Sequence, residues 1–295
     1  MFQSKFFSKT LKEAPKDEQA VSVQLLRRAG FIDKLMAGVY SFLPLGFRVL
    51  KKIEAIIREE MNKIGGQELL LPVLHPKELW QKTGRWQEFD ALYKLKSREG
   101  KEMALGPTHE EIIVPLVKKF IKSHKDLPIY LYQIQTKFRD ELRVKSGLLR
   151  NREFLMKDLY SFHNSQEDLE KFYEKMKEVY QKVFQRLGLK TLLVEASGGT
   201  FSKYSHEFQV LSEAGEDLVV YCSCGFARNR EITNLKEGNR CPQCGKGVKV
   251  SQSIEVGNIF KLGVKYSEPF GLKFKDKTGE EKLVFIGCYG IGLGR

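Results

Sequence analysis

The chain has 295 residues, of which 42% are apolar, so it is long enough to bury a sizeable core, and its composition argues against global disorder. Its 50 basic and 37 acidic residues give a formal net charge of +13, which favours polyanionic partners such as nucleic acid, although a merely basic soluble protein explains the charge equally well. The N-terminal segment is charged, which argues against a signal peptide, and no apolar run is long enough to span a membrane. The odd number of cysteines argues against a disulfide framework. We therefore expect a cytoplasmic protein with no membrane contact.

The first half of the chain predicts two helices and two strands. Residues 47–63 predict a helix because apolar residues recur at helical spacing, and two glycines end it. The segment QELLLPVLHP (67–76) then contributes a short buried strand that ends at Pro72. Residues 110–123 predict a second helix, and residues 128–141 have the apolar pattern of a strand in a large sheet.

The second half is richer in predicted strands. Residues 165–187 form the clearest helix, with an apolar stripe that core packing explains. From residue 192 the pattern becomes strand-like, with strands at 254–260 and 283–287, and the composition changes at 217–250, where cysteine, glycine and lysine concentrate. This order predicts an α+β fold built on a mostly antiparallel sheet flanked by helices, with a small cysteine-rich insert.

The stretch TKFRDELRVKSGLLRNREF (136–154) concentrates charges in a pattern that suits a nucleotide. If 134–141 and 150–161 are adjacent antiparallel strands, alternation of side chains lets one sheet face hold arginines, a carboxylate and an aromatic ring. Those groups match phosphates, an exocyclic amine and a base, respectively, so we predict a nucleotide site, with a charged structural hairpin as the alternative. The predicted face carries Arg139 and Glu141 from the first strand, and Arg150, Arg152 and Phe154 from the second.

Three motifs in order resemble those of class II aminoacyl-tRNA synthetases. Motif 1, which forms much of the family's dimer interface, is resembled by the helix–strand unit that ends at Pro72. Motif 2 is resembled by the pattern R-x-E, a loop and R-x-x-x-F. Motif 3 is resembled by the terminal segment GCYGIGLGR. Further segments, among them LGPTHEE, YQIQTKFRDE and SHEFQVL, are similar to bacterial prolyl-tRNA synthetases over nearly the whole chain. The resemblance implies a homodimeric, ATP-dependent ligase that forms prolyl-adenylate and charges tRNA(Pro). Alternatives are another class II specificity, such as threonine or serine, and a non-catalytic tRNA-binding relative.

The resemblance also assigns roles at the ATP site. It implies that Arg139 holds the α-phosphate at the point of attack and that Arg295 contacts the γ-phosphate, so these two are the expected catalytic residues. Glu141 would accept a hydrogen bond from the adenine amine, Phe154 would stack on adenine, and Arg150 would meet the γ-phosphate. The other residues expected near ATP are Arg152, Gln209 and Glu207, the last also as a Mg²⁺ ligand.

The proline site is expected around the loop GPTHEE. By resemblance, Thr108 and Glu110 bind the secondary ammonium of proline, Cys288 lies near its ring, and His163 has a role in the pocket. A carboxylate beside a small hydroxyl suits a cationic amine. Thr108 and Glu111 also have the spacing of a helix capping box, and both interpretations can hold together.

Four cysteines predict a metal site. Cys222 and Cys224 form a C-x-C pair, and Cys241 and Cys244 form a C-x-x-C pair 16 residues later. Two close pairs at this distance predict a structural zinc site, in which four thiolates leave no open position for catalysis; four reduced thiols are the alternative.

The resemblance divides the chain into a catalytic domain, at 1–216 and 251–295, and the insert at 217–250. This insert stands where many bacterial relatives carry a large editing domain, so we expect no editing in cis. Because the chain stops at Arg295, the last residue of motif 3, we expect a truncated chain without the anticodon-binding domain.

Overall fold

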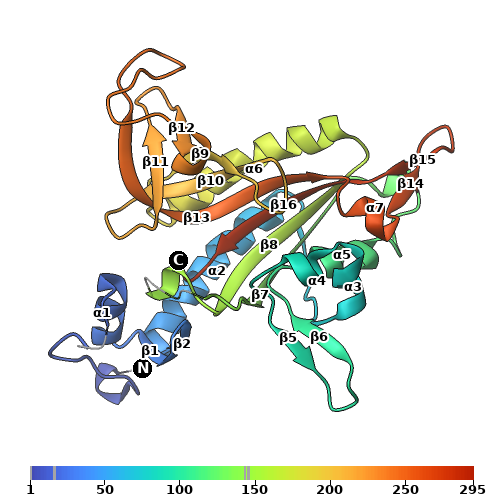
Figure 1. Ribbon diagram of the computed structural model, residues 1–295. Helices are drawn as coiled ribbons and strands as arrows, with labels where there is room; N and C mark the ends of the chain where they lie inside the picture. The colour runs from blue at the N-terminus through green and yellow to red at the C-terminus, as the bar shows by residue number, and fades with distance from the viewer. Residues whose placement is uncertain (1, 16–17, 143, 145–146) are drawn as a thin grey trace.

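The computed structural model describes residues 2–15, 18–142, 144 and 147–295. The fold is built around a central nine-stranded sheet (Figure 1). In chain order its strands are β3 (Gln67–Glu68), β7 (Ile129–Phe138), β8 (Glu153–His163), β9 (Leu192–Ser197), β10 (Tyr204–Leu211), β11 (Asp217–Tyr221), β12 (Ala227–Asn229), β13 (Lys249–Gly263) and β16 (Phe285–Gly292). Their order across the sheet is β10-β9-β12-β11-β13-β16-β8-β7-β3, and β10 also pairs with β13. Only the β9–β12 and β3–β7 pairings of these strands are parallel. The predicted α+β fold on a mostly antiparallel sheet is confirmed.

Two long helices, α2 (Pro44–Lys63) and α6 (Gln166–Arg186), cover one face of the sheet. Their apolar stripes meet the sheet in one core cluster that includes Tyr180 of α6 and Phe208 of β10, with ring centroids 5.1 Å apart. Pro44 suits the first turn of α2, where a missing N–H costs nothing, and the Ser165 side chain caps α6. The helices predicted at 47–63 and 165–187 are thereby confirmed.

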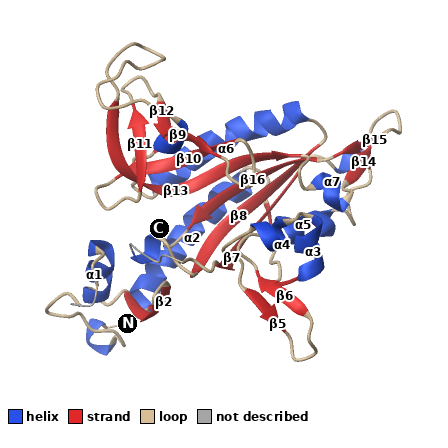
Figure 2. Ribbon diagram, in the orientation of Figure 1, coloured by secondary structure: helices blue, strands red, loops and turns tan. Residues whose placement is uncertain are grey.

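Short elements cover the other face. Figure 2 shows α3, α4 and α5 gathered beside β7, with the β5–β6 hairpin extending from them. A second core cluster there joins α5 and α7 to even-numbered residues of β8 and β16. The elements on this side are β4 (Leu74–Pro76), α3 (Lys77–Lys82), α4 (Arg85–Glu88), β5 (Lys94–Lys96), β6 (Glu102–Leu105), α5 (Glu110–Val117), η2 (His124–Asp126), α7 (Ser267–Phe270), β14 (Lys273–Lys275) and β15 (Glu281–Leu283).

The remaining elements lie in the N-terminal segment and in two connections. They are η1 (Gln3–Lys5), α1 (Val21–Arg28), β1 (Ile32–Met36), β2 (Val39–Phe42), η3 (Gly147–Leu149) and η4 (Arg230–Ile232). None of the helices in the described part of the chain combines the length and the apolar character that crossing a membrane requires.

The structure corrects two predicted elements. The segment 67–76 is not one buried strand: only Gln67 and Glu68 join the main sheet, both exposed, while Leu74–Pro76 belong to a separate small sheet. Pro72 has no N–H to offer a ladder, and the preceding Leu71 N–H bonds to a side chain instead. The helix predicted at 110–123 ends at Val117 and continues only as turns.

The cysteine-rich segment 217–250 contributes strands β11 and β12 to the main sheet. Strand β11 pairs with β13 from Asp217 to Tyr221, so no break in hydrogen bonding falls at residue 217. The division of the chain into a catalytic domain and an insert stays a prediction, but the strands of this segment reach the edge of the site described next.

Candidate active site

A cavity of about 430 Å³ opens on the face of the sheet opposite α2 and α6. Asp158 of β8 lines it, whereas the next residue, Leu159, belongs to the core cluster under α6, because successive side chains of a strand point to opposite faces. The cavity brings together most of the residues expected at the site: Thr108, Glu110, Arg139, Glu141, Arg150, Phe154, Cys288 and Arg295.

The β7–β8 pair ends where the cavity is richest in arginine. Strand β7 stops at Phe138 and β8 begins at Glu153, so the strands predicted at 134–141 and 150–161 are too long at this end. The Arg139 N–H still donates to the Arg152 carbonyl oxygen (2.8 Å), and the chain then leaves the sheet. Residues 143 and 145–146 of the connecting loop lie outside the described residues.

Arg152 does not line the cavity, whereas Phe154 does, so its expected role near ATP gains no support from its location. Its Nε and Nη2 donate to the carbonyl oxygen of Glu141 at 3.2 and 3.1 Å. Alternation of side chains holds only within a regular strand, and Arg152 precedes the first residue of β8. Its guanidinium therefore braces the backbone that carries Glu141.

Arg139 lines the cavity and has hydrogen-bond donors that are not used. Its guanidinium carbon is 5.2 Å from the ring centroid of Phe154, and Nη2 makes a long contact (3.4 Å) to the Pro107 carbonyl oxygen. Its Nε is buried and has no hydrogen-bond partner among the described residues. Burial, and then the nearby Arg295, lower the pKa of Arg139 below its ordinary value. A cation held with unused donors is suited to bind an anion.

The other two arginines of the cavity are paired with carboxylates that also line it. Arg150 Nε lies 3.0 Å from a Glu141 oxygen, and Arg295 Nη1 lies 2.7 Å from a Glu255 oxygen. The Arg150 side chain is 48% exposed and that of Arg295 is 29% exposed. Water-accessible pairs of this kind exchange partners at little cost, so Arg150 can turn to a phosphate. Arg295 also donates from Nε to the Leu149 carbonyl oxygen (2.8 Å) and from Nη1 to the Glu255 carbonyl oxygen (2.6 Å), so its guanidinium is held beside the cavity.

Thr108, Glu110 and Cys288 form the opposite, enclosed end of the cavity. Glu110 is fully buried; one carboxylate oxygen accepts from the Thr108 hydroxyl (2.5 Å) and the other from the Cys288 thiol (3.3 Å). Burial, and then Glu110, raise the pKa of Cys288 well above its ordinary value, so the thiol keeps its proton and donates. Both oxygens thus accept from neutral donors, Arg85 Nη1 lies farther away (3.6 Å), and the carboxylate faces the cavity, where it suits a cationic amine.

The predicted capping box at the start of α5 does not form. The N-cap position is His109, and no side chain caps the helix there. Glu111 instead accepts from Arg85 Nη1 at 2.9 and 3.1 Å, and Thr108 is turned toward Glu110. Of the two interpretations of Thr108, only the pairing with Glu110 is realised.

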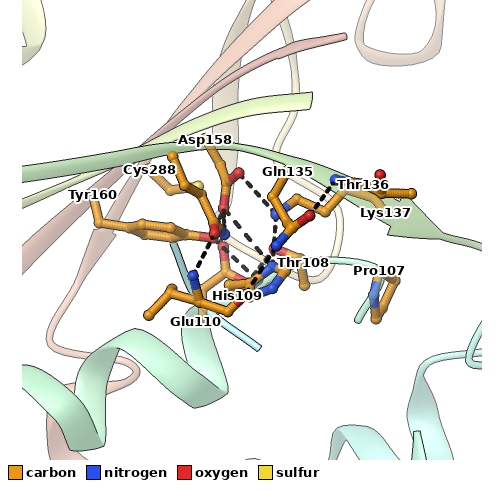
Figure 3. Close-up of polar contacts among 12 residues, drawn as sticks. Pro107, Thr108, His109, Glu110, Gln135, Thr136, Lys137, Asp158, Tyr160 and Cys288 are labelled. Atoms are coloured by element: carbon orange, nitrogen blue, oxygen red, sulfur yellow. Dashed lines mark hydrogen bonds and ion pairs between the residues drawn. The ribbon is translucent and has the colours of Figure 1, made fainter. Parts of the chain in front are cut away.

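A buried polar network behind the enclosed end escaped the sequence analysis (Figure 3). Lys137 Nζ lies 2.8 Å from an Asp158 oxygen and 2.6 Å from His109 Nδ1, and all three residues are almost fully buried. Burial, and then Lys137, lower the pKa of His109, so its neutral ring accepts at Nδ1 and donates from Nε2 to the Pro72 carbonyl oxygen (3.1 Å). The Tyr160 hydroxyl accepts from the His109 N–H and donates to Asp158. The network fixes the backbone between Thr108 and Glu110.

His163 is not brought to the cavity. Its odd position in β8 places it on the α6 face, where its ring packs near Tyr130 and Phe172, with centroids 5.9 and 5.5 Å away. Its Nδ1 lies 2.7 Å from an Asp168 oxygen near the start of α6. The expected pocket role therefore has no support from its location, because alternation turns this side chain away.

Glu207 and Gln209 border the cavity without lining it. Asn258, which lines it, donates to one Glu207 oxygen (3.4 Å), and Gln209 Nε2 donates to the other (2.8 Å). Burial, and then the nearby Glu255, raise the pKa of Glu207 to about 8. Asp217 also lines the cavity and accepts from the same Gln209 Nε2 (3.1 Å), so this edge holds two neighbouring carboxylates, a setting that a hard divalent cation fits.

The four cysteines of the insert meet at one point. All four sulfur atoms lie within 4.8 Å of one another, with 3.5 Å between Cys222 and Cys244 and 3.6 Å between Cys224 and Cys241. Sulfurs bound to one tetrahedral zinc ion are about 3.8 Å apart, so the arrangement fits zinc. None of them is in a disulfide among the described residues.

Residues 93–295 match the family model of the tRNA synthetase class II core domain (G, H, P, S and T). The proline--tRNA ligase of Halothermothrix orenii is 35% identical over 100% of this chain and 78% of its own length, and that of Sulfurihydrogenibium sp. is 36% identical over 100% and 79%. This chain belongs to the proline--tRNA ligase family. Members of this family are class II aminoacyl-tRNA ligases that activate proline and attach it to tRNA. The first alignment runs over 446 positions, so that relative has further residues within the matched span.

Two solved structures share the fold. The Giardia lamblia prolyl-tRNA synthetase in complex with prolyl-adenylate superposes with a TM-score of 0.74 at 21% identity, over 91% of this chain and 49% of that one. The Cryptosporidium parvum prolyl-tRNA synthetase complexed with L-proline and AMP gives a TM-score of 0.72 at 15% identity, over 92% and 49%. This chain therefore spans about half the length of these two proteins.

Proposed function

We propose that this chain activates proline with ATP and transfers it to tRNA(Pro) through a prolyl-adenylate. The observation that carries the proposal is that one cavity holds both an enclosed carboxylate for an amine, Glu110, and an open set of arginines for phosphates. The two related structures, bound to prolyl-adenylate and to L-proline with AMP, support this arrangement of ligands.

ATP would occupy the open end. Phe154 would stack on adenine, and Glu141 would accept from its exocyclic amine. Arg150 would exchange its carboxylate partner for the γ-phosphate, since the pair is partly exposed, and Arg295 would contact the same phosphate. Arg139, with its unused donors, would bind the α-phosphate between the two ends.

Proline would occupy the enclosed end. Its secondary ammonium would meet Glu110, which already accepts from Thr108, while Cys288 would contact the ring and keep its thiol protonated. The network of Lys137 and Asp158 would hold the loop in place.

The reaction then requires positioning more than covalent help from the protein. A carboxylate oxygen of proline attacks the α-phosphorus, the bond from that phosphorus to the bridging oxygen breaks, and pyrophosphate leaves. Arg139 stabilises the charge that builds up on the α-phosphate oxygens during this step. In the second step the terminal ribose hydroxyl of the tRNA attacks the prolyl carbonyl carbon, and AMP leaves.

The carboxylates beside the cavity would hold Mg²⁺. We propose Glu207 as a ligand, with Glu255 and Asp217 close by, because Gln209 Nε2 donates to both Glu207 (2.8 Å) and Asp217 (3.1 Å) and so brings the two carboxylates together. Burial, and then the nearby Glu255, raise the pKa of both groups. Bound magnesium would supply positive charge to the phosphates of ATP. Gln209 would orient Glu207 through its hydrogen bond.

The four clustered cysteines would hold a structural zinc ion. The ion would join the turn after β11, which carries Cys222 and Cys224, to the loop that carries Cys241 and Cys244. Metal analysis of protein purified without added zinc tests this: we expect about one zinc per chain, and about none in a Cys222→Ser/Cys241→Ser variant.

The partners and location follow the family. The formal charge of +13 suits tRNA(Pro), and exposed apolar side chains on α2 and beside β3, Phe47, Val49 and Leu70, would be covered in a homodimer. We propose a cytoplasmic protein. Its 217–250 insert, in place of an editing domain, would leave it without editing in cis.

Proline-dependent exchange of pyrophosphate into ATP tests the proposed function. We expect exchange with proline and little with threonine, serine or alanine. Exchange that follows threonine or serine would support a different class II specificity, and ATP binding without any exchange would favour a non-catalytic tRNA-binding protein.

A further inference from the structure

Arg85 lies behind the enclosed end of the cavity, in a place that neither the motifs nor the proposed mechanism use. It is 3% exposed and begins the short helix α4. Gly84, with a φ of +75°, makes the turn between α3 and α4 that directs Arg85 inward. Arg85 Nη1 contacts both carboxylate oxygens of Glu111, at 2.9 and 3.1 Å, and lies 3.6 Å from Glu110 Oε2.

The charges at this point do not balance. Glu110 and Glu111 are both 0% exposed, and Arg85 is the one arginine or lysine within ion-pair distance of either among the described residues. Glu111 takes the guanidinium together with the Thr83 hydroxyl (2.9 Å). Glu110 is left with the neutral donors Thr108 and Cys288. Arg85 thus lies closer to Glu111 (2.9 Å) than to Glu110 (3.6 Å), and Glu110, the less compensated of the two carboxylates, is the one that faces the cavity.

Aromatic rings hold Arg85 in place. In the described part of the chain its guanidinium carbon lies 4.9 to 5.8 Å from four ring centroids, and its Nε and Nη2 have no hydrogen-bond partner. Cation–π contacts therefore replace the hydrogen bonds that would otherwise compete with Glu111. One of these rings, Phe201, also lines the cavity. The rings belong to Trp80, Phe89, Phe201 and Tyr266.

We propose that Arg85 is the positioning residue of the amine site: it holds Glu111, so that Glu110 presents its negative charge to the substrate ammonium, and it supports Phe201 as a wall of the cavity. This inference rests on the proposed function, because it explains how the enclosed end selects a cationic amine. A substrate with a neutral group in place of the ammonium would leave the charge of Glu110 buried and without a partner.

Changing the charge balance tests this inference. Glu111→Gln leaves Arg85 free to neutralise Glu110, so the charge offered to proline falls to zero. Arg85→Gln leaves two adjacent buried carboxylates, which then share a proton because like charges at this distance cannot both ionise, so the remaining charge is divided between Glu110 and Glu111 and is no longer fixed on Glu110. The double variant R85Q/E111Q restores a single negative charge on Glu110.

The measurements are the Kd for radiolabelled proline by equilibrium dialysis and the KM values for proline and ATP in pyrophosphate exchange. We expect each single variant to weaken proline binding about tenfold or more, with the KM for ATP changed by less than about threefold. The double variant should bind proline more tightly than either single variant. Arg98→Gln, at an exposed arginine in the turn between β5 and β6, is the matched control and should behave as the wild type.

The inference would be overturned if the factor by which the double variant weakens proline binding equals the product of the factors for the two single variants. A merely structural role predicts this result, because the two losses of binding free energy would then add. Unchanged proline binding in E111Q would overturn it as well, and this variant decides the matter if R85Q does not fold. Wild-type protein that binds no proline would instead contradict the proposed function. Wild-type binding with unaffected single variants would contradict only the role of Arg85.

Discussion

The two ends of the cavity hold their charges in different ways. At the enclosed end, Glu110 is fully buried and accepts hydrogen bonds from a hydroxyl and a thiol. At the open end, Arg150 and Arg295 are partly exposed and rest on Glu141 and Glu255, carboxylates that line the same cavity. The enclosed end thus presents a buried carboxylate with neutral hydrogen-bond donors, and the open end presents partly exposed arginines that already have carboxylate partners.

The difference suits the two substrates. A small amino acid is recognised by a fixed charge in a closed space, where a misplaced or missing group leaves a buried carboxylate unpaired. A polyphosphate is recognised by arginines that exchange one anion for another as the ligand arrives. Mutations at the enclosed end should therefore act on proline with large effects, and those at the open end on ATP with smaller ones.

Arg139 stands between the two ends, so its loss should have the largest effect. We expect Arg139→Ala to lower kcat/KM for proline-dependent pyrophosphate exchange by about 10²–10³, because the interaction with the α-phosphate strengthens as charge develops on it. Steady-state exchange kinetics measure this, with the exposed Arg98→Ala as control. Near-normal exchange would remove Arg139 from the mechanism.

At the enclosed end, Glu110→Gln should raise the KM for proline about a hundredfold and leave the KM for ATP within about threefold. The amide keeps the size of the side chain and an oxygen that accepts from Thr108, so the change removes mainly the charge. Exchange assays with each substrate varied in turn give both constants. Equal increases in the two KM values would show that the ends are not separate.

At the open end, Arg150→Ala should raise the KM for ATP about five- to tenfold, with the KM for proline unchanged. The effect is smaller because the Arg150 side chain is 48% exposed and its interactions are weakened by water. It should shrink further at 0.5 M salt, where exposed charges are screened. An effect that does not depend on salt would mean that Arg150 acts from a more enclosed position.

On the opposite face of β8, the buried Lys157 should have a smaller effect, which concerns the stability of the fold. Lys157 is fully buried, its Nζ contacts the Tyr180 hydroxyl (2.5 Å) and the Tyr289 carbonyl oxygen (3.0 Å), and burial lowers its pKa to about 7. The unfolded chain binds this proton more tightly, so the free energy of unfolding should rise with pH between about 7 and 10. Denaturant unfolding at pH 7 and 9 measures the slope.

Lys157→Met should remove that pH dependence and raise stability most near pH 7, by an amount on the order of 1–3 kcal/mol. Lys190→Met, at an exposed lysine just after α6, is the control and should keep the slope. A wild-type slope that survives Lys157→Met would mean that another group is responsible.

The open end of the cavity was largely predictable from the sequence, because it depends on residues close together in the chain. Arg139, Glu141, Arg150 and Phe154 lie within 16 positions, and the spacing of the motif places them on one surface even though the strands are shorter than predicted. Arg152, just outside β8, donates to the Glu141 carbonyl oxygen and does not line the cavity, so alternation alone did not place its side chain.

The enclosed end was less predictable, because its partners are distant in sequence. Thr108 and Glu110 came from the resemblance, but nothing local shows that Glu111 turns to Arg85 rather than to a cap. The Lys137–Asp158 pair was equally hidden, although both residues fall on the cavity face by the same alternation that places Arg139 there. Tertiary contacts decide these positions, and a pattern of spacings does not contain them.

The most direct test of a single cavity with two ends is inhibition by a non-hydrolysable prolyl-adenylate analogue. Such a molecule joins the proline and adenosine parts and should fill both ends at once, with an affinity well above that of either substrate. We predict competitive inhibition against proline and also against ATP in the exchange reaction. Inhibition that is competitive with ATP but noncompetitive with proline would contradict the account, because proline would then bind elsewhere.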